Sequence, residues 1–161
     1  MKIIAAFAGT GKTYLAKKYP NVCADIDMGQ YRWIYDGDPA LPYEQRKAMR
    51  VFRENPEFPS NYISAIENAA KTHDIVLVSF CPELEQHFQA IGTPFYYFMP
   101  KQSAWGVLEQ RFQARNNAPR FFEVMRFKFD HDLAYPTDKH IRMEIGDDEF
   151  LEVALAREGF L

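Results

Sequence analysis

Near its start the chain carries the sequence Ala6-Phe7-Ala8-Gly9-Thr10-Gly11-Lys12-Thr13. This run follows the apolar residues 3–5 and leads into residues 13–19, whose pattern predicts a helix ended by Pro20. Glycines let a loop between a strand and a helix curl so that consecutive backbone N–H groups point at an anion, and the helix N-terminus adds its positive end. The sequence therefore predicts a phosphate-binding loop.

The side chains of this loop suit a nucleoside triphosphate. Lys12 is expected to reach the β- and γ-phosphates, and the Thr13 hydroxyl is expected to bind Mg²⁺. The expected nucleotide-binding residues are Ala8, Gly9, Thr10, Gly11, Lys12, Thr13 and Tyr14. The chain departs from the general pattern at Ala6, where that pattern has glycine. A glycine-rich turn that only caps a helix would explain the glycines but not the Lys-Thr pair, so ATP and Mg²⁺ are the predicted ligands.

Length and composition predict one domain, over residues 1–161. Hydrophobic residues make up 47% of the chain, which is ample for a core. The 19 basic and 22 acidic residues give a net charge of −3, without the basic excess expected of a protein that holds duplex nucleic acid. The chain has two cysteines and no apolar run long enough for a signal peptide or a membrane span. We expect a cytoplasmic protein with reduced thiols, and the sequence leaves the oligomeric state open.

Strand-like and helix-like segments alternate along the chain. Strands are expected at residues 2–6, 21–24, 75–78, 94–99 and 140–145, and helices at 13–19, 43–54, 60–71, 83–90, 103–115, from about 119 to 130, and 147–157. This alternation predicts an α/β fold of three layers, with a parallel five-stranded sheet covered by helices on both faces. Ligands of such sheets gather at the carboxyl ends of the strands.

Two carboxylates, Asp25 and Asp27, follow the second expected strand. Carboxylates at this position can hold Mg²⁺ or accept a proton from an attacking hydroxyl. We assign Asp25 to the metal and Asp27 to the acceptor as the candidate base, because Asp27 lies farther from the strand. Capping of a helix over residues 28–33 is an alternative role for either residue.

The third expected strand ends at Ser79, where many P-loop ATPases place an acidic residue. Asp74 stands at the start of that strand and not at its tip. The usual water-orienting and Mg²⁺-holding arrangement of mechanical ATPases is therefore missing. This favours phosphoryl transfer to an acceptor over hydrolysis.

Arg111 and Arg115 lie one helical turn apart on the same face of the helix expected at 103–115. Guanidinium groups stabilise the charge that phosphoryl transfer spreads over the equatorial oxygens. We expect both arginines to be catalytic, carried by a small helical lid over about residues 101–120. A solvated face paired with Glu109 is the alternative.

Basic residues also gather between the second and third expected strands. Arg46, Lys47, Arg50 and Arg53 have helical spacing, and Arg32 precedes them. We assign Arg32, Arg46 and Arg50 to an acceptor that already carries a phosphate. The aromatic residues Tyr31, Trp33 and Tyr35 could stack a base, although ordinary packing explains their alternation as well.

Together these segments resemble the small P-loop kinases, the nucleoside monophosphate kinase group with its shikimate and gluconate kinase relatives. The resemblance is carried by the Gly9-x-Gly11-Lys12-Thr13 core, Asp25-x-Asp27, the strand without an acidic tip and the arginine pair. It implies a sheet with the loop-bearing strand at its centre and, by similarity to shikimate-type kinases, roles for the aspartates toward Mg²⁺ and the acceptor hydroxyl. The chain also looks like small phage and prophage proteins described as nucleotide kinases, which implies no defined substrate.

We therefore expect an ATP- and Mg²⁺-dependent phosphotransferase that acts on a small acceptor, most simply a nucleoside or deoxynucleoside monophosphate. The acceptor-side arginines lack the spacing that would single out adenylate, guanylate or thymidylate. One alternative is a kinase that acts on a nucleic-acid end or a modified base. Another is a regulatory module that binds ATP without transfer.

Overall fold

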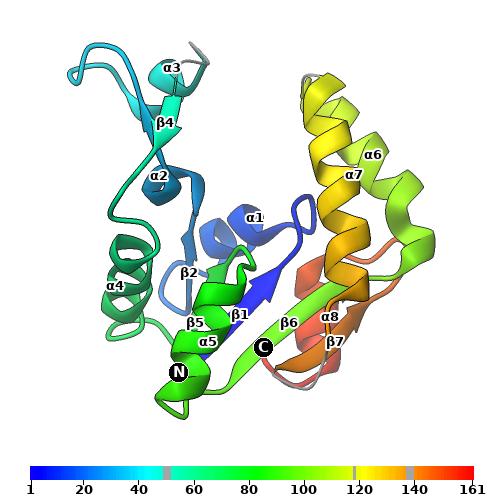
Figure 1. Cartoon of the computed structure of the whole chain (residues 1–161). Coiled ribbons are helices and arrows are strands. Elements are labelled where there is room, and N and C mark those ends of the chain that lie inside the picture. The colour runs from blue at the N-terminus through cyan, green and yellow to red at the C-terminus, as the bar shows by residue number, and fades with distance from the viewer. Residues whose placement is uncertain (49–51, 118, 137–139) are drawn as a thin grey trace.

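The computed structural model describes residues 1–48, 52–117, 119–136 and 140–161. Within them, five parallel strands form a sheet in the order β2-β5-β1-β6-β7 (Figure 1). The strands are β1 (Lys2–Ala6), β2 (Cys23–Ile26), β5 (Ile75–Val78), β6 (Phe95–Pro100) and β7 (Ile141–Ile145). The predicted α/β fold is thus confirmed, and the strand that leads into the phosphate-binding loop is central.

Side chains of β1 alternate between two apolar clusters, one on each face of the sheet. Ile3 and Ala5 join one cluster, whereas Ile4 and Ala6 join the other. The helices are α1 (Lys12–Lys18), α4 (Ser60–Ala69), α5 (Pro82–Ala90), α6 (Trp105–Ala114), α7 (Pro119–Ala134) and α8 (Leu151–Arg157). Helices α1 and α8 cover the Ile4 face, and α4 to α7 cover the Ile3 face. Burial of both faces explains the continuous apolar run of β5.

Strand β2 is displaced by two residues toward the C-terminus from its predicted position at 21–24. It pairs with β5 so that Asp25 lies beside Leu77 and Ile26 beside Val78. The backbone of β2 therefore carries Asp25 within the strand and Asp27 directly after it. Both carboxylates therefore lie at the carboxyl ends of the strands, where the phosphate-binding loop also begins.

Residues 29–48 and 52–54 belong to an arm beside the sheet, drawn in blue to cyan in Figure 1. It contains α2 (Gly29–Arg32), β3 (Trp33–Tyr35), α3 (Tyr43–Ala48) and β4 (Phe52–Glu54), and β3 pairs antiparallel with β4. The helix predicted over 43–54 is therefore wrong for residues 52–54. The helical spacing of the charges suggested a helix, but the Phe52 ring packs on Trp33 at 5.1 Å and Tyr35 at 5.7 Å between ring centroids. Such cross-strand aromatic pairs stabilise a hairpin.

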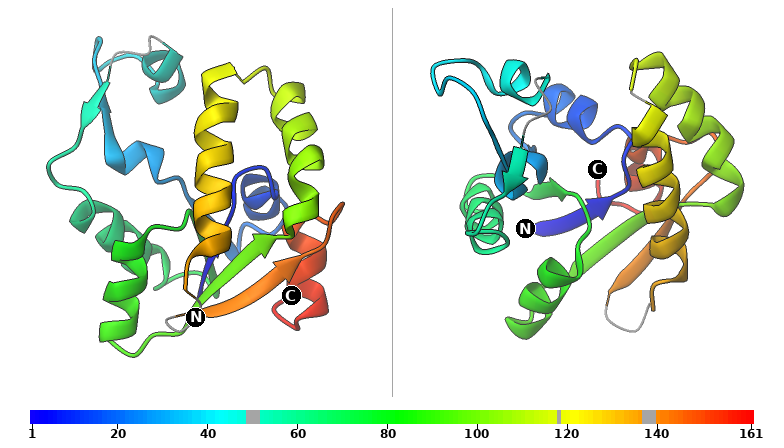
Figure 2. Two further views of the ribbon diagram at one scale, coloured as in Figure 1. Left: turned by 45° about the vertical axis from the view of Figure 1, so that its right-hand side comes forward. Right: turned by 45° about the horizontal axis from the view of Figure 1, so that its top comes forward.

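The segment predicted as a lid, about residues 101–120, contains a short 3₁₀ helix (Gln102–Ala104), α6 and the start of α7. Helices α6 and α7 lie side by side and project past the end of the sheet (Figure 2). The Trp105 ring packs on Phe129 at 5.3 Å, and Phe112 packs on Phe121 at 5.2 Å. Aromatic packing thus holds α6 against α7. No helix in the part of the chain that the structure describes is long and apolar enough to cross a bilayer.

Candidate active site

The phosphate-binding loop takes its shape from left-handed glycines and from the helices around it. Gly9 has φ 79° and Gly11 has φ 104°, which residues with a side chain rarely adopt. A methyl group on Gly9 would lie 2.8 Å from the Phe112 ring, so glycine is also needed for close approach. The Thr10 hydroxyl donates to the Phe7 carbonyl at 2.8 Å, and the Leu151 amide donates to the Thr10 carbonyl at 2.9 Å. The loop is thus held by its own side chain, by α6 and by α8.

Lys12 folds back over this loop. Its ammonium donates to the carbonyls of Ala6 at 2.7 Å and Phe7 at 3.2 Å. Burial lowers the pKa of Lys12 from 10.5 to about 8, against the opposing effect of the Asp25 and Asp27 carboxylates. A buried ammonium with two neutral acceptors is a group that an anion would stabilise.

Thr13 and Asp25 form the pair predicted to hold the metal. The Thr13 hydroxyl donates to Asp25 Oδ2 at 2.6 Å, across from α1 to β2. Both groups offer hard oxygen atoms, which Mg²⁺ prefers, and Mg²⁺ usually takes few protein ligands and keeps several waters. The donor set therefore fits Mg²⁺ beside the phosphate loop.

Asp27 lies where it can serve both as the cap of a helix and as the candidate base, the two roles that the sequence left open. Its Oδ1 accepts a hydrogen bond from the Gly29 amide at 3.0 Å, which fixes the start of α2. The side chain also lines the cleft described next, together with the phosphate loop. A carboxylate oriented by a backbone donor can still accept a proton from a group in that cleft.

A cleft of about 820 Å³ lies between the phosphate loop, β2, the arm and the end of α6. Its lining residues are Ala8, Gly9, Gly11, Lys12, Thr13, Tyr14, Ala16, Lys17, Pro20, Cys23, Ala24, Asp25, Asp27, Gln30, Glu44, Lys47, Ser79, Arg115, Asn117 and Phe121. The structure thus brings together most predicted nucleotide-binding residues, both aspartates and Arg115. Thr10 is the exception, because its side chain is buried and supports the loop from within.

The two arginines predicted to be catalytic point to different places. Arg115 lines the cleft, whereas the Arg111 guanidinium donates to the backbone carbonyls of Gly9 at 3.4 Å and Glu149 at 3.3 Å. The Arg111 guanidinium also lies 3.9 Å from the centroid of the Phe150 ring. Arg111 therefore braces the phosphate loop against the segment after β7 in this conformation.

Of the acceptor-side arginines, the two that the structure describes, Arg32 and Arg46, do not line the cleft. Arg32 pairs with Glu54 at 3.3 Å and lies over the ring of Phe58, and Arg46 donates to the Leu41 carbonyl at 3.2 Å. Arg50 lies outside the described residues. The arm residues that line the cleft are Gln30, Glu44 and Lys47. The sequence could have indicated Glu44 and Lys47, since they lie three residues apart on one face of α3.

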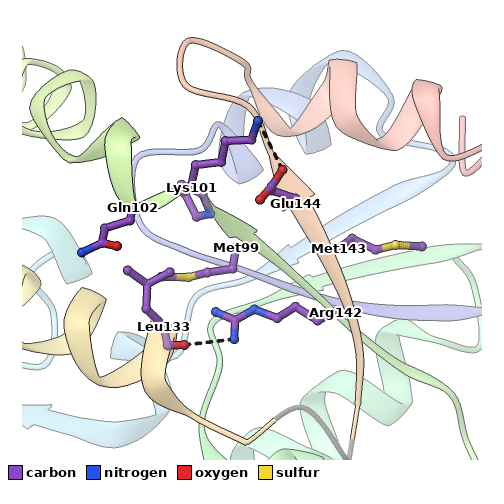
Figure 3. Close-up of a pocket in the computed structure, with 8 residues that line it drawn as sticks. Met99, Lys101, Gln102, Leu133, Arg142, Met143 and Glu144 are labelled. Atoms are coloured by element: carbon purple, nitrogen blue, oxygen red, sulfur yellow. Dashed lines mark hydrogen bonds and ion pairs between the residues drawn. The ribbon is translucent and has the colours of Figure 1, made fainter.

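A second cavity, of about 390 Å³, lies by the edge strand β7 and holds no residue of the phosphate loop (Figure 3). Its charged groups bind one another or the backbone: Arg142 donates to the Leu133 carbonyl at 3.2 Å, and Lys101 pairs with Glu144 at 3.4 Å. With its charges already partnered, this cavity has no group poised for chemistry. The cleft at the phosphate loop is the candidate active site.

Comparison with solved structures supports a kinase-like architecture. A gluconokinase from Sinorhizobium meliloti 1021 superposes with a TM-score of 0.51 at 12% sequence identity, covering 97% of this chain and 91% of that one. At this identity the likeness concerns the fold alone, and the chain accordingly has a P-loop kinase-like fold. No protein-family description and no curated protein matches the sequence.

Proposed function

We propose that this protein is an ATP- and Mg²⁺-dependent phosphotransferase that moves the γ-phosphoryl group of ATP to a small acceptor. The observation that carries the proposal is the convergence of Lys12, the Thr13–Asp25 pair, Asp27 and Arg115 on one cleft. Phosphoryl transfer depends mainly on positioning and on charge stabilisation, and these groups provide both. The gluconokinase-like fold agrees with a small-molecule kinase.

Each residue has a defined role in this proposal. The loop amides from Ala8 to Thr13 and the Lys12 ammonium hold the β- and γ-phosphates, and Tyr14 lies beside them. Thr13 and Asp25 would hold Mg²⁺, which would supply positive charge against the negative charge that develops on the phosphates. Arg115 lines the same cleft from the end of α6 and stabilises the charge of the transferring group.

The acceptor predicted from the sequence, a nucleoside monophosphate, remains a candidate. Lys47 and Arg115 are the cations that could meet its phosphate, since Lys47 lines the arm side of the cleft. Asp27 favours a second candidate, an acceptor whose nucleophile is a hydroxyl. A phosphate oxygen is already ionised at neutral pH and needs no base, whereas an alcohol must lose a proton as it attacks.

The proposed cytoplasmic location is supported by Cys23 and Cys81, which are both free and buried. The resemblance to phage and prophage nucleotide kinase-like proteins stays a prediction. So do the lid role of the segment about 101–120 and the assignment of Arg111 to catalysis.

The deciding experiment is an acceptor screen that measures ADP formation from ATP and Mg²⁺. It offers nucleoside and deoxynucleoside monophosphates, nucleosides, sugar acids and single-stranded oligonucleotides. Acceptor-dependent ADP formation that is lost in Lys12→Ala supports the proposal. ATP binding without turnover on any acceptor would favour a regulatory module, and turnover confined to oligonucleotides would favour a nucleic-acid kinase.

A further inference from the structure

The first turn of helix α4 holds a tyrosine whose hydroxyl lies between two strands of the sheet. Tyr62 is fully buried in the apolar cluster of the Ile3 face. Its hydroxyl donates to the Ile26 carbonyl of β2 at 2.9 Å. The same oxygen accepts a hydrogen bond from the Ser79 amide, directly after β5, at 3.2 Å. A side chain of α4 thus joins the carboxyl ends of two neighbouring strands.

This hydroxyl stands where the ladder of β2 and β5 would have its next hydrogen bond. The Ile75 amide donates to the Val22 carbonyl at 2.9 Å, and the two strands pair in parallel from that point. In a parallel pair, hydrogen bonds of one direction recur at every second residue. By this count the regular partner of the Ser79 amide is the Ile26 carbonyl. Both groups bind Tyr62 instead.

The inserted hydroxyl separates the strand ends beside the cleft. Two hydrogen bonds in series span a wider gap than the single bond that they replace. Asp25 and Asp27 line the cleft from the side of β2, and Ser79 lines it from the end of β5. The Tyr62 hydroxyl therefore sets how far the two carboxylates lie from the neighbouring strand.

A second side chain of the same turn holds the chain beyond Asp27. The Asn61 side-chain amide donates to the Tyr31 carbonyl at 2.9 Å. Tyr62 and Asn61 thereby fix the backbone on both sides of Asp27, at the end of β2 and within α2. The position of the Asp27 carboxylate consequently depends on α4 as well as on its own strand.

The phenol of Tyr62 is held in direction and keeps its proton. Its ring packs on Tyr31 at 5.5 Å and on Phe58 at 6.1 Å between ring centroids. Burial raises the pKa of Tyr62 well above its usual value, and the negative charges of Asp25 and Asp27 raise it further. A neutral hydroxyl can donate and accept at the same time, so it binds both strand ends at neutral pH.

Building on the proposed phosphoryl transfer, we propose that Tyr62 and Asn61 are positioning residues of the active site. Neither side chain lines the cleft, so both act through the aspartates. Tyr62 keeps the end of β2 in the place where Asp25 meets Thr13 at the metal site. Together with Asn61 it holds Asp27 toward the cleft. Positioning is a main part of phosphoryl transfer, and a misplacement of about 1 Å can lower a rate about 10²-fold.

The test uses Tyr62→Phe, which removes only the hydroxyl, and Asn61→Ala, which removes the second anchor. The matched control is Tyr97→Phe. Tyr97 is buried in the same apolar cluster, but its hydroxyl donates to the Asp132 carboxylate of α7 and not to a strand end. Each variant is measured for its Tm and for kcat and KM with the best acceptor of the screen. Calorimetry gives its affinity for ATP with and without Mg²⁺.

The expected result is a loss that follows the aspartates. Tyr62→Phe should lower kcat about 10- to 100-fold, and Asn61→Ala about 3- to 10-fold. The tightening of ATP binding by Mg²⁺ should decrease about 10-fold in Tyr62→Phe, whereas ATP affinity without Mg²⁺ should change less than about twofold. Tyr97→Phe also loses a buried hydrogen bond and should lower the Tm, but it should change kcat and the Mg²⁺ effect less than about twofold.

The outcomes separate this role from the proposed function. A kcat that is unchanged in Tyr62→Phe, or lowered equally in Tyr97→Phe, overturns the positioning role while the phosphotransferase stands. Should Tyr62→Phe fail to fold, Asn61→Ala decides, and an unchanged kcat in that variant overturns the role. If the wild type turns over no acceptor, the proposed function fails. Calorimetry then decides for Tyr62, because an unchanged Mg²⁺ effect overturns its role and a reduced effect supports it.

Discussion

The buried charge of Lys12 should make the ligand-free protein less stable than a variant without it. The pKa of Lys12 falls from 10.5 to about 8 because the ammonium is buried. At 1.36 kcal/mol per pH unit, this lowering corresponds to about 3 kcal/mol of destabilisation while Lys12 is protonated. Lys12→Met removes the charge and keeps a chain of similar length. It also removes the hydrogen bonds to Ala6 and Phe7, so we expect a net gain of about 1–2 kcal/mol at pH 7.

The pH dependence of this gain follows from the direction of the pKa change. Between pH 8 and 10.5 the unfolded chain binds a proton on Lys12 that the folded protein has lost, so the stability of the wild type rises with pH. Methionine does not titrate. The advantage of Lys12→Met should therefore be full below about pH 8 and decrease toward pH 10.5.

Thermal unfolding followed by circular dichroism, at pH 7 and at pH 10 without nucleotide, measures this difference. A gain of about 1–2 kcal/mol should raise the Tm of the variant by about 2–8 °C at pH 7. Saturating Mg·ATP should reverse the order, because only the wild type keeps tight binding; ligand at 100 times its Kd adds about 2.7 kcal/mol. A variant that is less stable than wild type at pH 7, or a difference equal at both pH values, would refute this reasoning.

Four further predictions concern the cleft. Asp27→Asn should lower kcat about 10²- to 10⁴-fold with a hydroxyl acceptor and leave ATP affinity unchanged; a loss of ATP affinity measured by calorimetry would contradict the role as base. Asp25→Asn should raise the Mg²⁺ concentration needed for half-maximal activity about 10-fold or more, read from a metal titration. Arg115→Ala should lower kcat, whereas Arg111→Ala should weaken ATP binding because its contacts brace the loop at Gly9; equal kinetic profiles would refute the distinction. Gly9→Ala should weaken ATP binding and lower the Tm, since the methyl group would lie 2.8 Å from Phe112; unchanged values would show that the ring can move.

The centre of the fold could be predicted because its signals are local. In residues 2–13 an apolar strand, a glycine-rich loop and a Lys-Thr pair follow one another directly. Together they indicate a phosphate-binding loop. The run 75–78 has apolar residues throughout, and the structure buries all four. Parallel strands of this kind have few alternative arrangements once helices lie between them.

The arm could not be predicted from spacing, because its strands depend on contacts across the chain. Phe52 looks like a helix residue in its own segment, and only the rings of Trp33 and Tyr35 make it a strand residue. The same limit applies to acceptor residues. Arg46 was predicted from its charge alone. In the structure, Glu44 and Lys47 of α3 line the cleft, whereas Arg46 donates a hydrogen bond to the Leu41 carbonyl.

The arginine pair illustrates a third limit. Helical spacing places residues four apart on one face only while the helix continues. Helix α6 ends at Ala114, so Arg115 is its C-terminal cap, and the following chain turns through Asn116 with φ 54°. Arg115 consequently reaches the cleft, while Arg111 remains beside the loop.

The one departure of the phosphate loop from the general pattern has a structural reason. Ala6, which replaces the first glycine, is the last residue of β1 and is 1% exposed. Its side chain joins the apolar cluster with Leu15 and Phe98, so it faces the core and not the phosphates. The residues with left-handed backbone are Gly9 and Gly11, and the supports for the turn come from α6 and α8. Alanine at position 6 therefore leaves the anion-binding turn intact and adds a side chain to the core at the point where the strand ends.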